Sequence, residues 1–367
     1  MTTQYTIDLI AAARPNFMKV SPLYHALRQA SWANTRLIHT GQHYDPNMSQ
    51  AFFDDLGLPP PDKHLGVGSG THAQQTAGVM ISYEELCMHE RPDWIIVVGD
   101  VNSTVACTLV GAKLHIPVAH LEAGLRSGDR DMPEEINRLV TDTLADLLWT
   151  PSSDGDENLL AEGVPPHKIE MIGNIMIDSF EMMRDRIENS EARAALGLSG
   201  DYGVVTLHRP SNVDDPLILK SLVEQLATVA GEVPLVFPIH PRTRKQLERY
   251  GLLETLNASA NIQPVDPLGY IDFMNLVTGA QFVITDSGGV QEETTYLGIP
   301  CLTVRENTER PVTVNAGTNQ LIGPSMIATS VSEVRNQGSK HVQPPKYWDG
   351  KTAGRAVASL KARLSDD

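Results

Sequence analysis

The sequence predicts an α/β protein made of two doubly wound, Rossmann-like domains. Short, continuous runs of apolar and β-branched residues recur along the chain, and each is followed by a longer segment with helical periodicity. Continuous hydrophobicity is typical of strands that are buried on both faces of a parallel sheet. The alternation forms two series, from Thr6 to about Pro151 and from Val204 to about Gly323. The length of 367 residues also corresponds to roughly two average domains.

Eight of the apolar runs are predicted to be strands, four in each series. They are Thr6–Ala12, Leu37–Thr40, Trp94–Val98, Val118–Leu121, Val204–Leu207, Leu235–Ile239, Phe282–Thr285 and Cys301–Val304. Between the two series, Met171–Asn174 indicates a short strand and Glu181–Ala195 a charged helix on the surface.

The end of the chain indicates an amphipathic helix. Apolar residues recur there at helical spacing, at Ala353, Val357, Leu360 and Leu364. We therefore expect an N-terminal domain over residues 1–172 and a C-terminal domain over residues 173–349. The closing segment, 350–367, is expected to pack back towards the N-terminal domain. Two such domains that face each other would form a cleft, because ligands of open α/β sheets bind beyond the carboxyl ends of the strands.

Composition excludes several classes of protein. The formal charge is 29 − 45 = −16, which argues against nucleic-acid binding but not against an anionic substrate, since a few local cations and helix N-termini are enough to bind one. An apolar content of 41% excludes a disordered chain. The chain lacks a signal-peptide pattern and an apolar run as long as a membrane span. Its three cysteines, Cys87, Cys107 and Cys301, fit neither a disulfide framework nor a metal pair. These features favour a soluble, cytoplasmic protein.

Charged side chains follow the strands of the first series. They are Arg14 and Lys19, then Asp100, then Glu122, and then Glu134 and Glu135 at the start of a helix. Asp100 and Glu122 would lie at neighbouring strand ends, where carboxylates suit general acid–base catalysis. Structural alternatives stay open. Asp100 could cap a helix, and Glu134 and Glu135 could stabilise the start of their helix by interacting with the positive end of its dipole. Arg14 and Lys19 could be solvated surface charges.

The second series carries basic residues and a glycine turn after its strands. His208 and Arg209 end one strand and His240 ends the next, although a lone histidine is more often structural. The segment Asp286–Glu293 combines a serine with two glycines at a helix start, which is suited to phosphate binding. Because this is neither a Walker loop nor a GxGxxG motif, an NTPase or a dehydrogenase is disfavoured. A diphosphate site in one domain and acids in the other indicate a nucleotide-sugar enzyme.

The motifs together resemble one family, the non-hydrolysing UDP-N-acetylglucosamine (UDP-GlcNAc) 2-epimerases. They are Arg14-Pro…Lys19, Gly41-Gln-His43, Gly99-Asp100, His120-Leu-Glu-Ala-Gly-Leu-Arg126, Pro133-Glu-Glu135…Asn137-Arg138, Gly173-Asn174…Asp178, His208-Arg209, Asp286-Ser-Gly-Gly-Val-Gln-Glu-Glu293 and Glu309-Arg-Pro311. The resemblance covers nearly the whole chain. It implies a two-domain glycosyltransferase-B-type fold, a homodimer, and interconversion of UDP-GlcNAc and UDP-N-acetylmannosamine through 2-acetamidoglucal, with no metal and no other cofactor.

The resemblance also implies roles for individual residues. The catalytic residues would be Asp100, Glu122, Glu135 and His208. A purely structural role at the positive end of the helix dipole then remains for Glu134 but not for Glu135. Which of them is the acid and which the base stays open. The substrate-binding residues would be Arg14, Lys19, Arg209, His240, Tyr270, Ser287, Gly288, Gly289, Glu293 and Arg310. Of these, Arg14, Lys19 and Arg310 would hold the diphosphate, Glu293 the ribose, and Tyr270 would stack near uracil.

Some family members have a regulatory UDP-GlcNAc site, whose candidates here include Gln42, His43 and Gln75. Asp45 stands there in place of a typical Gln, and Gln74 in place of a typical Arg. The loss of the arginine's charge would weaken a contact with the diphosphate, so we expect weak or absent activation by UDP-GlcNAc. Asn16 and Ser211 also depart from the pattern, with no role that the sequence explains.

Three alternative functions stay open at this point. The first is a 2-epimerase of UDP-2,3-diacetamido-glucuronate, which Gly41–Met48 and Gly68–His72 also resemble, although Arg310 in Glu-Arg-Pro favours the UDP-GlcNAc branch. The second is a hydrolysing 2-epimerase. The third is a UDP-sugar-binding protein without turnover, against which the four acid–base residues argue.

Overall fold

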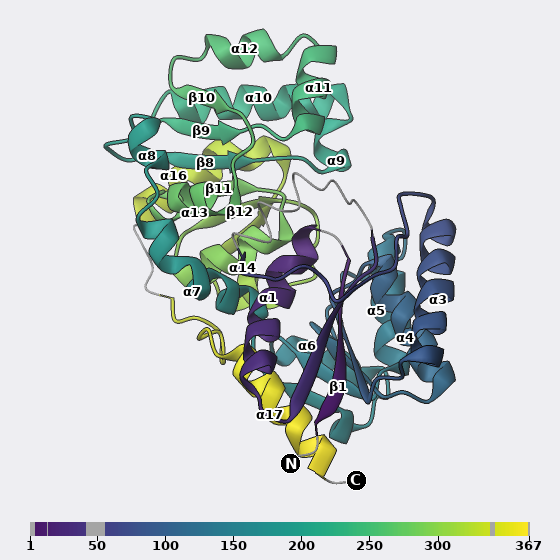
Figure 1. Ribbon diagram of the computed structural model, residues 1–367. Coiled ribbons are helices and arrows are strands. Elements are labelled where there is room, and N and C mark those ends of the chain that lie inside the picture. Colours follow the sequence, from purple (N-terminus) through teal and green to yellow (C-terminus); the bar gives the residue numbers. More distant parts are fainter. Residues whose placement is uncertain (1–3, 13, 42–55, 338–341, 366–367) are drawn as a thin grey trace. The chain divides into compact units, whose positions relative to one another are not determined.

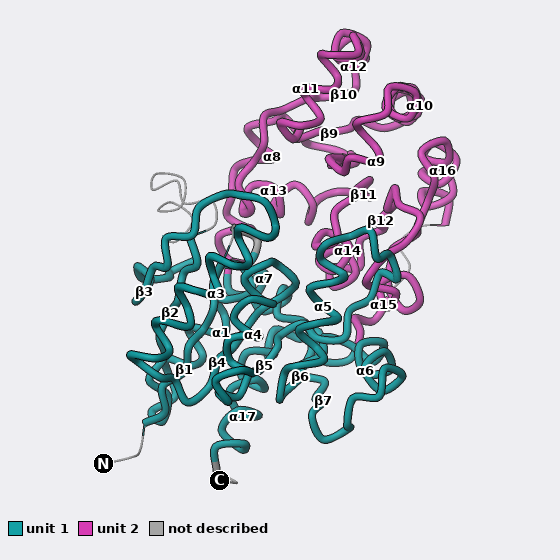
Figure 2. The backbone as a smooth tube through the Cα atoms, turned by 90° about the vertical axis from the view of Figure 1, so that its right-hand side faces the viewer, with its two compact units in different colours: residues 1–182, 346–367 teal, residues 183–345 magenta. Residues whose placement is uncertain are grey.

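The computed structural model describes residues 4–12, 14–41, 56–337 and 342–365. The chain forms two compact units, which Figure 2 shows in different colours. Unit 1 comprises Met1–Met182 with Lys346–Asp367, and unit 2 comprises Met183–Pro345. Each unit is built on one parallel sheet with alternating helices (Figure 1), so the predicted fold class is confirmed.

The sheet of unit 1 has seven strands in the order β3-β2-β1-β4-β5-β6-β7. Its elements, in chain order, are β1 Tyr5–Ala11, α1 Arg14–Gln29, β2 Ala33–His39, β3 Lys63–His64, α3 His72–His89, β4 Trp94–Val98, α4 Asn102–Leu114, β5 Val118–Leu121, α5 Pro133–Leu144, β6 Leu147–Thr150, α6 Ser153–Ala161, β7 Ile169–Met171, α7 Ile175–Glu188 and α17 Thr352–Ser365. The strand order reverses between β1 and β4, and this switch point is the preferred ligand site of such sheets.

The sheet of unit 2 has six strands in the order β10-β9-β8-β11-β12-β13, with its switch point between β8 and β11. Its elements are α8 Ala192–Ala195, β8 Gly203–Thr206, α9 Pro210–Val213, α10 Pro216–Ala230, β9 Leu235–Pro238, α11 Pro241–Arg249, α12 Leu253–Ala258, β10 Ile262–Val265, α13 Tyr270–Thr278, β11 Phe282–Thr285, α14 Gly288–Leu297, β12 Cys301–Val304, α15 Pro311–Asn315, β13 Asn319–Ile322 and α16 Ile327–Gln337.

Each sheet has its own apolar core. In unit 1, Ile95 and Val97 of β4 pack with Tyr83 of α3 and Val110 of α4, so these two helices cover one face of the sheet. Every residue of β4 is buried, as expected for a central strand of a parallel sheet. Among the described residues, no helix is long and apolar enough to cross a bilayer.

The division between the units falls inside α7, later than the sequence boundary after residue 172. The start of α7 belongs to unit 1 because Asp178 accepts hydrogen bonds from the backbone of Thr352 (3.1 Å) and Ala353 (2.8 Å) at the start of α17. Helix α17 lies beside α1 (Figure 1), and Trp348 donates to the carbonyl of Pro151 at 3.0 Å. Residues 173–182 and 346–349, which the sequence assigned to the C-terminal domain, therefore pack in unit 1.

Candidate functional site

The switch point of unit 1 is braced by Asn16. Its Oδ1 accepts the backbone N–H of Ala12 at 3.1 Å, and its Nδ2 donates to the carbonyl of Val98 at 2.8 Å. These bonds tie the carboxyl end of β1 to that of β4, and the first of them satisfies the buried backbone N–H of Ala12. The departure at Asn16, unexplained in the sequence, thus has a structural role.

Three acids gather at this edge of the unit 1 sheet, and we call them, with Lys19 and Arg138, the acid cluster. Arg138 donates to Asp100 Oδ2 from Nε (3.0 Å) and Nη2 (2.7 Å), and to Glu135 Oε2 from Nη1 (2.5 Å). Lys19 forms an ion pair with Glu122. The structure therefore brings together Asp100, Glu122 and Glu135, each of them paired with a cation.

Accessibility separates the three acids. The side chain of Asp100 is 29% exposed, whereas those of Glu122 and Glu135 are each 3% exposed. Glu135 also accepts backbone N–H groups of Ser127 (3.0 Å) and Gly128 (2.9 Å). Burial raises the pKa of Glu135, but these hydrogen bonds and Arg138 outweigh burial and leave the pKa below its usual value. Glu135 is thus held as a carboxylate, and Asp100 is the cluster acid that a ligand can reach.

Glu122 sits on strained backbone. Its φ is +71°, in the left-handed region that a non-glycine residue rarely adopts, and Gly99 opposite has a φ of +68°. A Cβ on Gly99 would lie 3.4 Å from Glu122 Oε2 and 3.5 Å from Lys19 Nζ. Glycine at 99 therefore allows the turn after β4 to pass close to this ion pair.

The switch point of unit 2 holds a histidine–aspartate pair. His208 follows β8, and its Nδ1 lies 2.8 Å from Oδ1 of Asp286, which follows β11. Asp286 is fully buried and also accepts from the backbone of His208 (2.9 Å) and Arg209 (2.8 Å) and from Asn212 (3.0 Å). Burial raises the pKa of Asp286, but His208 and Asn212 lower it below its usual value, so it is a carboxylate. An acceptor at Nδ1 fixes the proton there and leaves Nε2 of His208 for proton transfer.

His240 lies beside this pair. The rings of His208 and His240 are 5.3 Å apart between centroids, and His240 Nδ1 accepts the backbone N–H of Arg242 at 3.2 Å. Burial and the neighbouring His208 lower the pKa of His240, so a neutral ring is favoured.

Arginines and glutamates surround the glycine turn of unit 2. Arg310 is paired with Glu292 and Glu309, both at 2.8 Å, and Arg305 reaches Glu309 at 2.8 Å. Burial raises the pKa of Glu309, but the two arginines lower it well below its usual range. The turn itself is close to this pair, because a Cβ on Gly288 would lie 2.8 Å from Arg310 Nη1 and 3.1 Å from Glu309 Oε1.

The remaining predicted residues of unit 2 surround the start of α14. Ser287 precedes this helix, and a Cβ on Gly289 would meet open space. Tyr270, at the start of α13, donates its hydroxyl to Glu293 Oε1 at 2.7 Å. Burial, with the charge of Glu292, raises the pKa of Glu293 to about 8. Glu293 is therefore protonated near neutral pH and can donate as well as accept.

The raised pKa of Glu293 predicts a pH-dependent loss of stability. The folded state keeps the proton until about pH 8, whereas an ordinary glutamate in the unfolded chain releases it near pH 4.5. Stability should therefore fall as the pH rises from about 4.5 to about 8. Glu293→Gln removes this penalty, and its stability relative to wild type should improve by on the order of 3 to 4 kcal/mol between pH 5 and pH 8.

Urea unfolding of both proteins at the two pH values measures this change. Glu333→Gln, at an exposed position of α16, is the matched control and should show no such pH-dependent difference. An unchanged stability difference for Glu293→Gln at pH 5 and pH 8 would contradict the assignment.

The proposed regulatory residues are only partly described. Gln42, His43 and Asp45 lie outside the described residues, as does the side chain of Arg14. Gln74 closes a capping box with Thr71 at the start of α3. Gln75 accepts from Asn102 at 2.8 Å, and Asn137 donates to both Asn102 (3.3 Å) and the carbonyl of Asp100 (2.8 Å). A chain of hydrogen bonds thus joins Gln75 to the backbone of Asp100.

Arg138 and Asp286, which gave no role in the sequence, take part in these networks. His120 and Asp142, which also gave none, form a separate buried pair in unit 1, with Nδ1 of His120 2.6 Å from Oδ1 of Asp142. Arg138 and His120 stand inside motifs that match the family, and Asp286 directly precedes the glycine turn, so these motifs were their signal. Asp142 lies in a helical stretch with no such signal.

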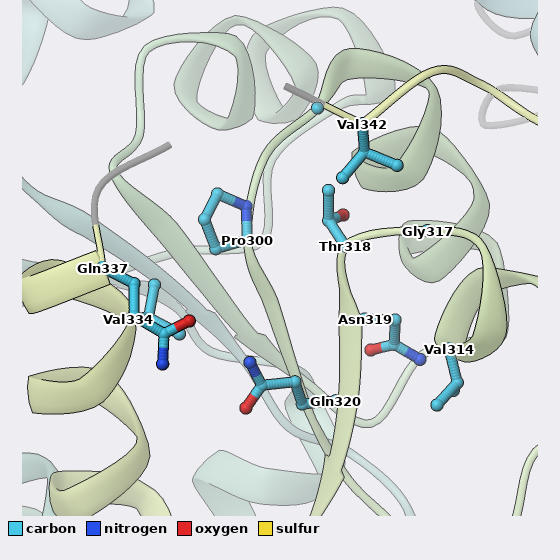
Figure 3. Close-up of a pocket in the computed structure, with 10 residues that line it drawn as sticks. Pro300, Val314, Gly317, Thr318, Asn319, Gln320, Val334, Gln337 and Val342 are labelled. Carbon is cyan, nitrogen blue, oxygen red and sulfur yellow. The ribbon is translucent and has the colours of Figure 1, made fainter. Parts of the chain in front are cut away.

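Unit 2 also contains a pocket of about 200 Å³ (Figure 3). Pro300, Thr318, Asn319 and Gln320 line it, at the amino ends of β12 and β13. His208, Asp286 and Arg305 follow carboxyl ends of strands, the edge at which such sheets bind ligands. We therefore assign no part of the site to this pocket. Within the described part of the chain, no group of three or more His, Cys, Asp or Glu side chains could hold a metal ion.

Comparisons with known proteins show which family the chain resembles. A family model described as UDP-N-acetylglucosamine 2-epimerase matches residues 25–361. The chain is 40% identical over 362 residues to the UDP-N-acetylglucosamine 2-epimerase of Methanocaldococcus jannaschii, covering 96% of this chain and 98% of that protein. It is 39% identical over 360 residues to the UDP-2,3-diacetamido-2,3-dideoxy-D-glucuronate 2-epimerase of Pseudomonas aeruginosa, covering 97% and 99%. The crystal structure of the M. jannaschii enzyme with UDP-GlcNAc and UDP matches with a TM-score of 0.87 at 39% identity, covering 97% and 99%.

Proposed function

The chain belongs to the UDP-N-acetylglucosamine 2-epimerase family, and from that premise we propose that it interconverts UDP-GlcNAc and UDP-N-acetylmannosamine without net hydrolysis. The observation that carries the proposal is the acid cluster, in which an accessible Asp100 is oriented by a buried arginine beside two buried acids. Proton exchange at a carbon needs a positioned general acid or base, and a carboxylate held in this way can supply one.

The proposed reaction has two balanced half-steps. A base takes the C2 proton, the C2–H electron pair forms the C1–C2 double bond, and the C1–O pair leaves with UDP, which gives 2-acetamidoglucal. A proton then reaches C2 from the opposite face, and the UDP oxygen adds back to C1. The departing UDP gains negative charge on its β-phosphate, and cations placed at that point lower the barrier.

Each group has a proposed task. Asp100 exchanges the C2 proton, because it is the accessible acid of the cluster, while Glu122 and Glu135 hold the cations and the loops around it. In unit 2, Arg310 and the start of α14 hold the diphosphate, and Glu293 with Tyr270 holds the ribose. His208, oriented by Asp286, transfers a proton through Nε2.

One experiment tests the reaction. The protein is incubated with UDP-GlcNAc in D2O and followed by proton NMR. Deuterium at C2 together with UDP-N-acetylmannosamine is the expected result. Free N-acetylmannosamine would identify a hydrolase, and no change despite detectable binding would leave a different sugar or a binding protein.

The second candidate substrate is UDP-2,3-diacetamido-glucuronate, because the P. aeruginosa 2-epimerase is almost as similar. The charge balance of the acid cluster favours the neutral sugar. The described cations there, Lys19 and Arg138, are already paired with Glu122, Asp100 and Glu135. An added sugar carboxylate would have to compete for them. A higher kcat/KM with the glucuronate would reverse this choice.

We further propose that the protein works as a homodimer in the cytoplasm and supplies its product to polysaccharide synthesis. Sedimentation equilibrium tests the dimer directly. A monomer at the concentrations used for the assay would contradict it.

Gly288→Ala is expected to weaken UDP binding about tenfold, which corresponds to about 1.4 kcal/mol. The added Cβ would meet Arg310 Nη1 at 2.8 Å, so the guanidinium must move away from the proposed diphosphate site. Titration calorimetry with UDP measures the loss. Gly200→Ala, which meets open space in the same unit, should bind like wild type. Equal affinities for all three proteins would remove Arg310 from the UDP site.

A further inference from the structure

A buried histidine lies directly beneath the acid cluster. His120, on β5, is fully buried, and both of its ring nitrogens face hydrogen-bond acceptors. Nε2 lies 2.8 Å from the carbonyl of Gly99, and Nδ1 lies 2.6 Å from Oδ1 of Asp142. A carbonyl oxygen can only accept, so Nε2 must carry a hydrogen.

The partner at Nδ1 is a carboxylate. Oδ2 of Asp142 accepts the backbone N–H of Gly124 at 3.0 Å and lies 2.7 Å from Arg126 Nη1. The guanidinium of Arg126 and the backbone N–H of Gly124 are donors that do not depend on His120, and together they hold Asp142 as a carboxylate. A carboxylate donates no hydrogen, so Nδ1 of His120 must carry one too. The hydrogen-bond pattern therefore describes an imidazolium.

This ring joins the elements that carry the cluster acids. Gly99 directly precedes Asp100, and its N–H donates to the carbonyl of Leu121 at 3.0 Å, next to Glu122. Asp142 lies on α5, the helix that also carries Glu135. Gly99 has a positive φ, which gives the peptide group between Gly99 and Asp100 a specific orientation. The hydrogen bond from His120 Nε2 to the carbonyl of Gly99 holds this peptide group in place, and with it the backbone of Asp100.

We propose that His120 is a positioning residue of the acid cluster, which acts as an imidazolium between Asp142 and Gly99 and holds the backbone of Asp100 in the orientation for proton transfer at C2. The effect on turnover rests on the proposed function, whereas the protonation state does not. His120 touches no substrate, so its contribution passes through Asp100.

Two substitutions of His120 distinguish a role in positioning Asp100 from a role in packing the core of unit 1. In His120→Gln, the amide nitrogen falls near the position of Nε2 and can still donate to the carbonyl of Gly99. This variant has no donor near the position of Nδ1, so Asp142 loses its hydrogen bond from residue 120. The amide nitrogen of asparagine falls near Nδ1 and can still donate to Asp142, but loses Gly99. His120→Gln should therefore be the less stable variant and yet the more active one.

The expected values follow from misplacement of Asp100. His120→Asn should lower kcat by about 10² with KM within about threefold of wild type, because a displaced catalytic group costs rate rather than binding. His120→Gln should keep kcat within about tenfold of wild type despite a lower Tm. Activities that rank in the same order as the Tm values would reduce His120 to a structural residue and overturn the proposal.

The protonation state is measured on the wild-type chain, independently of turnover and of whether a variant folds. Protein labelled with ¹⁵N-histidine should show, at pH 7, two N–H-bearing ring nitrogens for His120, assigned by their loss in His120→Asn. An unprotonated ring nitrogen at this position would overturn the imidazolium. If wild type shows this signature but no C2 exchange with UDP-GlcNAc, the proposed substrate fails while the imidazolium stands.

Discussion

Replacing Asp100 with Asn is expected to lower the rate of C2 proton exchange in UDP-GlcNAc by about 10²- to 10⁴-fold, the usual contribution of a general acid or base. Asparagine has nearly the same shape and can still accept from Arg138, so the cluster geometry should persist. The amide cannot take or return a proton, and the exchange step itself should therefore fail. UDP binding should be unchanged, because Asp100 is not among the residues proposed to hold UDP and its pairing with Arg138 should persist.

The measurement is deuterium incorporation at C2, followed by NMR, with calorimetric titration of UDP on the same sample. Asp131→Asn makes the same chemical change at an exposed position before α5 and should exchange like wild type. Near-normal exchange in Asp100→Asn would transfer the role to Glu122 or Glu135. A loss of UDP binding would instead mean that the substitution disturbs more than the acid cluster.

The sequence predicted most of the central strands, although not β6, and predicted the edge strands β3 and β10 poorly, for a physical reason. Strands β4, β5 and β11 are buried on both faces and read as continuous apolar runs. Edge strands are shielded on one side only, so their sequences are polar or interrupted: β3 is only Lys63–His64, and β10 contains Pro264. These strands therefore carry no pattern of the kind used for prediction.

The candidate site was predicted as a set of residues but not as a set of pairs. Spacing along the chain placed Asp100, Glu122 and Glu135 after strands that end at one edge of a sheet. It gave no indication that Arg138 would bridge two of these acids, because that contact depends on how α5 is oriented over the sheet. The unit boundary inside α7 was missed for a related reason, since it depends on hydrogen bonds from Asp178 to the distant start of α17.

Arg138→Met is expected to destabilise the fold by about 3 to 5 kcal/mol and to abolish detectable C2 exchange. The side chain of Arg138 is 4% exposed and donates to both Asp100 and Glu135. Methionine keeps much of the volume but leaves the buried carboxylate of Glu135 without its cation. Asp100 loses its two side-chain donors from Arg138 at the same time, so its carboxylate is no longer oriented. Urea unfolding and the deuterium assay measure the two effects separately.

The double variant Arg138→Met with Glu135→Gln separates neutralisation from orientation. Removing the carboxylate that Arg138 neutralises should restore most of the lost stability, because the cost of breaking a buried pair comes mainly from the charge left behind. The amide oxygen introduced by Glu135→Gln can still accept from the backbone of Ser127 and Gly128. Exchange should stay low, since Asp100 still lacks the guanidinium that orients it. A double variant that regains both stability and wild-type exchange would show that Arg138 only neutralises Glu135, and would leave Asp100 oriented by the backbone around it alone.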